Sequence, residues 1–260
     1  MNRLSKTIWL VLVAAFIVAG CEQRCQEEAS VYEPFFDPNF VVPDYASGAI
    51  EATGGHQAWT KARELEFDCV VTFYHPDGSF YLTEQHYEIH PWSNLIRISA
   101  FEPDGESVWQ LSEGRFSVLE GAGQVGTLLP IDVCGYCFGE AILNITTAPV
   151  RFLESKAEFT KSSEAVKKEG QWYYPIERSG LEIYEIVQDG SRVIFYQNRD
   201  NSLVDMVWFA NAAEEKFLAV RGYDYHEVEE KGVCVPSKIE IFRTDDEGVL
   251  QERLVKIDFK

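Results

Sequence analysis

The sequence has few basic residues for its length and lacks the signatures of the common enzyme folds. It contains 23 Lys and Arg against 42 Asp and Glu, which gives a formal net charge of −19. An acidic excess of this size repels phosphate backbones, so we expect no nucleic-acid partner. There is no Gly-x-Ser-x-Gly elbow, no phosphate-binding loop and no zinc-protease helix. We therefore predict a protein that is not an enzyme and has no catalytic residue, metal or cofactor.

A long apolar run is also missing. The run from Ile8 to Val18 is shorter than the roughly 20 residues of a membrane-spanning helix. Arg3 and Lys6 precede this run and small residues follow it, as in a secretory signal peptide. The segment Val18-Ala19-Gly20-Cys21 resembles the bacterial lipobox, which implies cleavage before Cys21 and acylation of that cysteine.

These features predict that residues 1–20 are a signal peptide. After the signal peptide is removed, the rest of the chain is expected outside the cytoplasm. The loss of Arg3 and Lys6 changes the net charge from −19 to −21. Several acyl chains on one cysteine anchor a protein stably, so we expect a bacterial cell-envelope lipoprotein on the periplasmic side. Glu22 does not decide between inner and outer membrane, and we favour the outer one.

The cysteines left after Cys21 are odd in number, which is unusual in an oxidising compartment. Cys134 and Cys137 lie close enough in sequence to form a disulfide. Cys69 and Cys234 lie in predicted strands and either bridge them or stay free as buried thiols. Cys25 is our candidate for the unpaired one.

The beginning of the domain is marked by a helix. Residues 21–43 are typical of an extended tether, whose aromatic side chains touch the domain or the membrane. Asp44 is expected to be the N-cap of a helix through Thr53, with Gly54 at its end. The domain is therefore predicted to cover residues 44–260.

From Leu65 onward, apolar residues fall on every second position between turns, which predicts antiparallel strands in an up-and-down order. Twelve strands are expected, at residues 65–73, 80–89, 94–101, 106–111, 115–119, 171–176, 181–187, 192–196, 203–209, 217–225, 233–242 and 249–259. Between residues 121 and 155 the alternation stops, and short apolar segments predict a lid with helical pieces. A mainly β fold follows, with a curved antiparallel sheet that forms an incomplete barrel.

The alternation also predicts what the sheet encloses. Phe67, Val71 and Phe73 share one face of their strand with Leu65 and Cys69, while acidic residues lie on the other face. Two residues of a late strand, Ile239 and Ile241, repeat the pattern. We expect a concave apolar face and a convex acidic one, with Phe67, Val71, Phe73, Ile239 and Ile241 lining a ligand cavity. Glycines in the lid (Gly121, Gly123, Gly126, Gly135 and Gly139) favour a loose fit that opens.

A family resemblance supports this fold. The sequence AIEATGGHQAW at residues 49–59 resembles the opening of LolA-like proteins, which include periplasmic carriers and outer-membrane receptors of lipoproteins. Residues 189–196 and 232–241 are similar to later segments of that family. The resemblance implies an incomplete barrel with a helical lid and an apolar cavity for acyl chains. Because Cys21 would tether the chain, we expect an anchored protein that binds a lipid or a lipidated partner rather than a shuttle.

Two other functions compete with this one. A structural or assembly protein of the envelope would bind a protein partner and have a filled core. A thiol-disulfide oxidoreductase would use Cys134 and Cys137, but the β-branched residues that soon follow do not suggest the long helix such a site needs. His86 and His90 lie about 13 Å apart in a strand, too far to share a metal ion.

Overall fold

The computed structural model describes residues 36–37, 39–102, 105–112, 114–121, 134–154, 157–179, 191–211 and 216–260. Contacts divide the chain into residues 1–32 and 33–260. The second unit has its own core, so it should fold by itself, and the description below concerns this unit. The predicted signal peptide, the lipidation residue Cys21 and Cys25 lie outside the described residues.

The described part of the chain is mainly strand. Its helices are α2 (Asp44–Ala52), α3 (Gly55–Lys61), the 3₁₀ helix η1 (Pro91–Ser93), α5 (Gly135–Thr146) and α6 (Ala148–Arg151). Its strands are β1 (Leu65–Tyr74), β2 (Phe80–His90), β3 (Leu95–Glu102), β4 (Gly105–Ser112), β5 (Arg115–Glu120), β6 (Glu158–Lys161), β7 (Val166–Lys168), β8 (Gln171–Ser179), β9 (Ser191–Asn198), β10 (Val204–Asn211), β11 (Lys216–Glu227), β12 (Cys234–Thr244) and β13 (Leu250–Phe259). No helix in these ranges is both long and apolar enough to cross a membrane.

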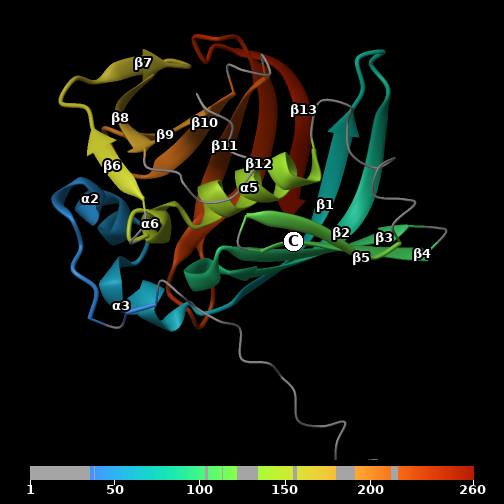
Figure 1. Ribbon diagram of the computed structural model, residues 1–260, viewed down its shortest axis with the longest axis horizontal. Helices are drawn as coiled ribbons and strands as arrows, with labels where there is room; N and C mark the ends of the chain where they lie inside the picture. Colours follow the sequence, from blue (N-terminus) through green and yellow to red (C-terminus); the bar gives the residue numbers. More distant parts are fainter. Residues whose placement is uncertain are drawn as a thin grey trace, which may run out of the picture. The chain divides into compact units, whose positions relative to one another are not determined.

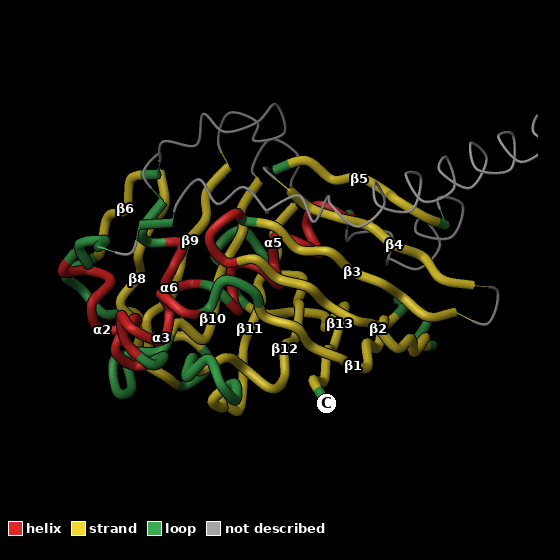
Figure 2. Tube along the Cα trace, turned by 90° about the horizontal axis from the view of Figure 1, so that it is seen from below, coloured by secondary structure: helices red, strands yellow, loops and turns green. Residues whose placement is uncertain are grey.

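All strands of the described residues belong to one antiparallel sheet with the order β5-β4-β3-β2-β1-β13-β12-β11-β10-β9-β8-β6, and β7 also pairs with β8. Helix α5 contacts β3, β4 and β5 as well as β10, β11 and β12. One helix can touch both halves of the sheet only because the sheet curls around it, as Figures 1 and 2 show. The described strands do not close the curl, since β5 and β6 end the order without pairing with each other. The predicted incomplete barrel is therefore confirmed.

Most predicted strands are present, and the differences lie near β8. The expected strand at 181–187 lies outside the described residues. Strands β6 and β7 were missed because they are short and share one edge of β8. Asp44 is not an N-cap, because the extended Pro43 precedes the helix and its carbonyl accepts the first amide bonds, from Ala46 and Ser47.

The inner face of the sheet holds the main core. Val71 pairs with Ile257 across β1 and β13, and Ile257 pairs with Ile239 across β13 and β12. All three side chains are fully buried. The alternation read from the first strand therefore continues in register across three strands.

The outer face differs from the prediction of an acidic convex surface. Over β8 to β11 it carries a second apolar cluster, made of Tyr173, Ile194, Tyr196, Met206, Trp208, Ala210 and Ala219. Val166 of β7 packs against this cluster. The turn before β13 also covers it, since a Cβ on Gly248 would lie 3.2 Å from the Trp208 ring. This part of the outer face can be apolar because neighbouring segments pack over it. The alternation of apolar residues along a strand does not reveal such packing.

Candidate functional site

The five predicted cavity residues lie together on the inner face, facing α5. Val71, Phe73, Ile239 and Ile241 are fully buried, and Phe67 is 9% exposed. The Phe73 ring lies 5.8 Å from the Phe138 ring of α5. In this structure the five side chains are part of the packed core beneath the helix.

Helix α5 fits closely against both halves of the sheet. A Cβ on Gly139 would lie 3.1 Å from a methyl group of Leu111 in β4, and one on Gly222 of β11 would lie 3.2 Å from Ile145 of α5. A Cβ on Gly135 would lie 2.4 Å from the Phe116 ring. The prediction that lid glycines give a loose fit is wrong at Gly135 and Gly139, because the missing side chains let helix and sheet approach each other.

In the described ranges, α5 packs against the sheet through apolar side chains. Its buried residues include Phe138, Ile142, Leu143 and Ile145, which are at most 2% exposed. The hydrogen bonds of its polar side chains stay within the helix, from Asn144 to Glu140 and from Thr146 to Ile142. No hydrogen bond or ion pair joins the helix to a described strand, so the helix can leave these strands without breaking either kind of bond.

The N-terminal end of α5 carries the Cys-Gly-Tyr-Cys motif. The structure places Cys134 and Cys137 in a disulfide with their Cα atoms 5.1 Å apart. Cys134 is the N-cap of α5, and its sulfur accepts a hydrogen bond from the amide of Cys137 at 3.1 Å. The expectation that no long helix follows this motif is wrong, because α5 runs for 12 residues. Packing of its apolar side chains outweighs the low helix propensity of Ile145 and Thr146.

The C-terminal end of α5 leads to a buried cluster of charges, which the sequence did not indicate. Glu154 accepts hydrogen bonds from Arg151 at 2.8 Å and from Asn94 at 2.7 Å, and a further one from Arg178 of β8. Arg151 and Glu154 are three residues apart, but Arg178 comes from a distant strand. Only the folded chain brings these residues together.

The remaining cysteines and histidines form no site in the part of the chain that is described. Cys69 and Cys234 are both free thiols. They lie on β1 and β12, which β13 separates, so the barrel-closing bridge is not present. Burial raises the pKa of Cys69 to about 12, which keeps its thiol protonated and inert. His86 pairs with Asp68 at 2.8 Å, and the described residues hold no cluster with metal-ligand geometry.

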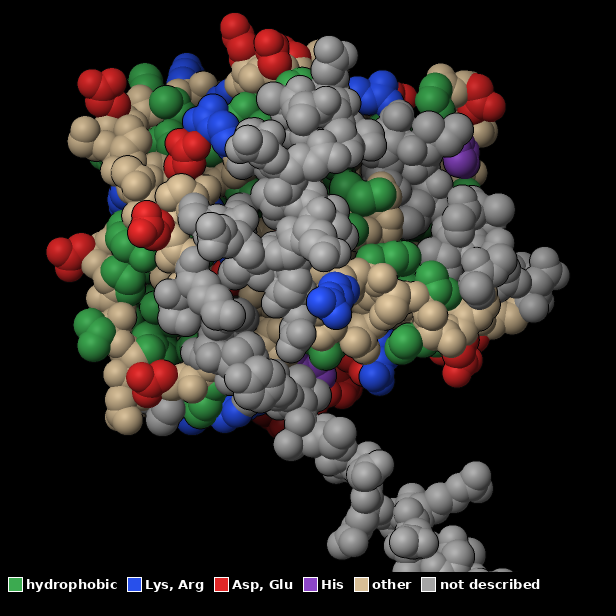
Figure 3. Space-filling view, viewed as in Figure 1, with side chains coloured by type: hydrophobic (Ala, Val, Ile, Leu, Met, Phe, Trp, Pro, Cys, Tyr) green, Lys and Arg blue, Asp and Glu red, His purple; other side chains and the backbone are tan. Residues whose placement is uncertain are grey.

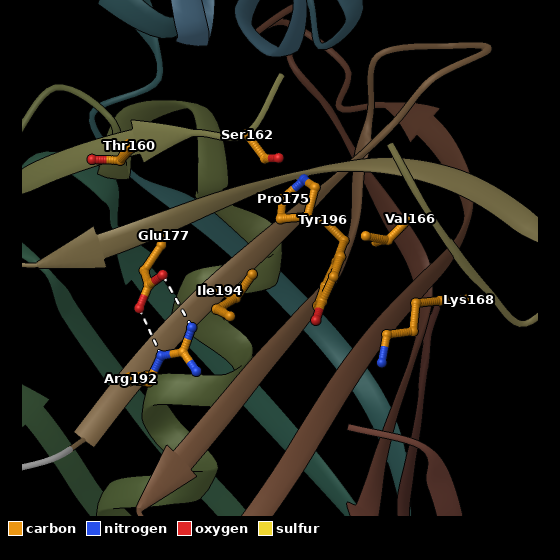
Figure 4. A pocket seen from close by; sticks show the side chains of 9 residues that line it. All are labelled: Thr160, Ser162, Val166, Lys168, Pro175, Glu177, Arg192, Ile194 and Tyr196. Carbon is orange, nitrogen blue, oxygen red and sulfur yellow. Dashed lines mark hydrogen bonds and ion pairs between the residues drawn. The ribbon is translucent and has the colours of Figure 1, made fainter. Parts of the chain in front are cut away.

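A groove of about 430 Å³ lies on the outer face of β6 to β9 (Figure 4). It is lined by Thr160, Ser162, Val166, Lys168, Pro175, Glu177, Arg192, Ile194 and Tyr196. Its cations already have partners. Arg192 binds Glu177 through two hydrogen bonds of 2.7 and 3.1 Å, which lower the pKa of that carboxyl, and Lys168 donates to the carbonyl of Glu247 at 2.7 Å. The groove therefore offers no unpaired charge to a ligand.

Charge on the visible surface is mixed. On the face shown in Figure 3, described acidic and basic side chains both occur around the edge, and the acidic ones lie side by side only at the top. The described part of this face thus gathers no large patch of one sign that would direct a charged macromolecule.

Comparison with known proteins identifies the fold. No family model matches the chain, and no curated protein matches its sequence. Among solved structures, a LolA superfamily protein from Nitrosomonas europaea is similar with a TM-score of 0.50 and 11% identity, over 85% of this chain and 92% of that one. A DUF1329 family protein from Desulfovibrio piger is similar with a TM-score of 0.48 and 12% identity, over 86% of this chain and 92% of that one. A putative outer membrane lipoprotein-sorting protein domain from Vibrio parahaemolyticus is similar with a TM-score of 0.41 and 9% identity, over 83% of this chain and 91% of that one.

These likenesses concern the fold. The chain has a LolA-like fold, an incomplete antiparallel barrel with helices on its inner face, as the segment at residues 49–59 predicts.

Proposed function

We propose that this chain is a lipoprotein of the bacterial cell envelope that binds an acyl chain on the inner face of its sheet. The acyl chain belongs to a lipid or to a lipidated partner protein, and it takes the place of α5. The observation that carries this proposal is the attachment of α5 through apolar side chains, with no hydrogen bond or ion pair to a described strand, because an acyl chain can replace apolar contacts. The LolA-like fold and the cavity that the family resemblance implies support the same function.

The energies of the two states are comparable. Releasing the four large apolar side chains of α5 costs about 6 to 12 kcal/mol, at about 1.5 to 3 kcal/mol for each buried side chain. Burying a chain of about 16 carbons gains about 12 kcal/mol, at about 0.8 kcal/mol per methylene. An acyl chain of ordinary length therefore offsets the loss of α5. In this proposal, the arrangement with α5 in place is the closed state.

The binding proposal is tested with residues 33–260, which form the compact unit. The purified protein should carry lipid that mass spectrometry identifies, and after lipid removal it should bind a fluorescent fatty acid. Val71→Trp, on the inner face, should abolish binding. Val70→Trp is the matched control, because Val70 is only partly buried on the opposite face of β1.

Circular dichroism shows whether each variant is folded. If the wild-type protein carries no lipid and binds no fatty acid, the chain is better explained as a structural or assembly protein with a filled core.

The membrane anchor is proposed to be the acyl group on Cys21. Cells fed a palmitate analogue should label the wild-type protein but not Cys21→Ser, and that variant should leave the membrane fraction. Label and membrane fractionation that both persist in Cys21→Ser would show that the chain is held by other means. We also propose that the outer membrane holds it, which fractionation of the two membranes would test.

A second candidate function is thiol-disulfide exchange, favoured by the position of Cys134 at the start of α5. The helix N-terminus lowers the pKa of a thiol placed there, once the disulfide is reduced. We propose that the disulfide is structural, so purified protein should neither reduce nor isomerise a test disulfide. Turnover comparable to that of a known isomerase would establish the second function.

A further inference from the structure

The buried charges at the C-terminal end of α5 carry more positive than negative charge. Side chains of Arg151 and Glu154 are each 1% exposed, and that of Arg178 is 8% exposed. We call these three residues the Arg151 cluster. Two guanidinium groups face a single carboxylate, so the cluster has an excess of one positive charge. A buried charge of this kind is costly unless it is paired.

The guanidinium groups also have N–H donors without a hydrogen-bond partner among the described residues. Nε and Nη2 of Arg151 and Nε of Arg178 have no hydrogen-bond partner among the residues described. Both oxygens of Glu154 are already engaged, one by Arg151 and Asn94 and the other by Arg178. Buried polar groups in folded proteins nearly always have partners, so these donors are available to a further acceptor.

Helix α5 carries three polar residues on one side, and the first of them, Tyr136, is coupled to this cluster. Tyr136, Glu140 and Asn144 follow one another at four-residue spacing, which places them on one side of the helix. Burial raises the pKa of Tyr136, and the charge of Glu140 raises it further, while Arg151 and Arg178 oppose the shift. The tyrosine therefore lies within the field of the cluster.

The carboxylate of Glu140 does not pair with either arginine; it accepts a hydrogen bond of 2.6 Å from Asn144.

When α5 leaves the sheet, Tyr136 leaves the field of the cluster with it. We propose that the Arg151 cluster then receives the anionic head of the acyl ligand, a carboxylate or a phosphate. The free donors of Arg151 and Arg178 would bind its oxygens, since the guanidinium fork matches both groups. This inference rests on the proposed acyl-binding function and specifies the chemical class of the ligand.

Competition binding tests the proposal. Lipid-free protein of residues 33–260 is loaded with the neutral apolar fluorophore 1-aminoanthracene, which is displaced by palmitate, hexadecyl phosphate or 1-hexadecanol. The two anionic ligands should bind roughly tenfold or more tightly than the alcohol, because hydrogen bonds to charged groups are strong. Arg151→Gln should remove this preference and leave hexadecanol binding unchanged. Arg192→Gln, at an exposed arginine paired with Glu177, is the matched control and should retain the preference.

Should Arg151→Gln fail to fold, Arg178→Lys keeps the charge, removes the free Nε donor and should weaken the preference. Equal affinity of palmitate and hexadecanol in the wild-type protein would overturn the headgroup site while acyl binding stands. A preference that persists in a folded Arg151→Gln protein would also overturn it. Displacement by inorganic phosphate alone would show a site for a free anion and refute a lipid head. If none of the three long-chain ligands binds, the acyl-binding function fails, and this inference fails with it.

Discussion

The two glycines between α2 and α3 should respond very differently to the same substitution. Gly54 has a φ of +111°, and a Cβ there would lie 2.1 Å from the carbonyl oxygen of Gly232. Gly55 has a φ of +80°, and its Cβ would meet only the flexible side chain of Glu51, at 3.5 Å. Gly54→Ala therefore combines backbone strain with a collision against backbone, whereas Gly55→Ala brings strain alone.

The expected losses follow from these contacts. Strain at an unfavourable φ costs about 1 to 3 kcal/mol and overpacking costs about 1 to 3 kcal/mol, so Gly54→Ala should lower the free energy of unfolding by about 2 to 6 kcal/mol. Gly55→Ala should lower it by about 1 to 2 kcal/mol. Urea unfolding followed by tryptophan fluorescence measures both values on residues 33–260. Equal losses in the two variants would refute the close approach of the α2–α3 corner to the turn at Gly232.

Three further perturbations should give the following results. Replacing both Cys134 and Cys137 by serine should lower the free energy of unfolding by about 2 kcal/mol, the value for a disulfide that closes so short a loop. The loss should come from the disulfide alone, because the new serine can still cap α5. An unchanged free energy of unfolding would mean that the two thiols are not joined. Phe138→Ala should lower the free energy of unfolding by about 3 to 5 kcal/mol, because the ring is fully buried; a loss below about 1 kcal/mol would mean that α5 is not docked. Hydrogen bonding to Arg192 lowers the pKa of Glu177, so the wild-type protein should exceed Arg192→Gln in melting temperature near neutral pH. This difference should shrink as the pH falls through the lowered pKa and the carboxylate is protonated, and a difference independent of pH would contradict the ion pair.

Much of the fold can be predicted because the sheet follows local rules. Alternation in β1 identifies which side chains face the interior, and the Gly54-Gly55 pair marks the corner between two helices. The prediction fails where segments distant in sequence determine whether a side chain is buried. Trp208 lies on the outer face yet is only 5% exposed, because the turn between β12 and β13 packs against its ring, and no period in the sequence encodes that contact.

The candidate site was predictable on its apolar side only. Val71 and Ile241 follow from the strand period, but the tight fit of α5 depends on Gly139 meeting Leu111, residues that are distant in sequence. The Arg151 cluster depends on Arg178, which the fold brings to Glu154 from a strand 24 residues later. A charged residue in an acidic chain gives no sign of burial until its partners are known.

Locking α5 to the sheet is the most direct test of whether an acyl chain replaces this helix. The ideal Cβ of Gly139 lies 3.2 Å from the Cβ of Leu111, close to the range that a disulfide spans. The variant Gly139→Cys with Leu111→Cys should bind a fluorescent fatty acid when reduced and lose that binding when oxidised. The wild-type protein, treated with the same reductant and oxidant, is the control for the native cysteines. Equal binding by the oxidised and reduced variant, with mass spectrometry showing the cross-link, would mean that the acyl chain does not take the place of α5.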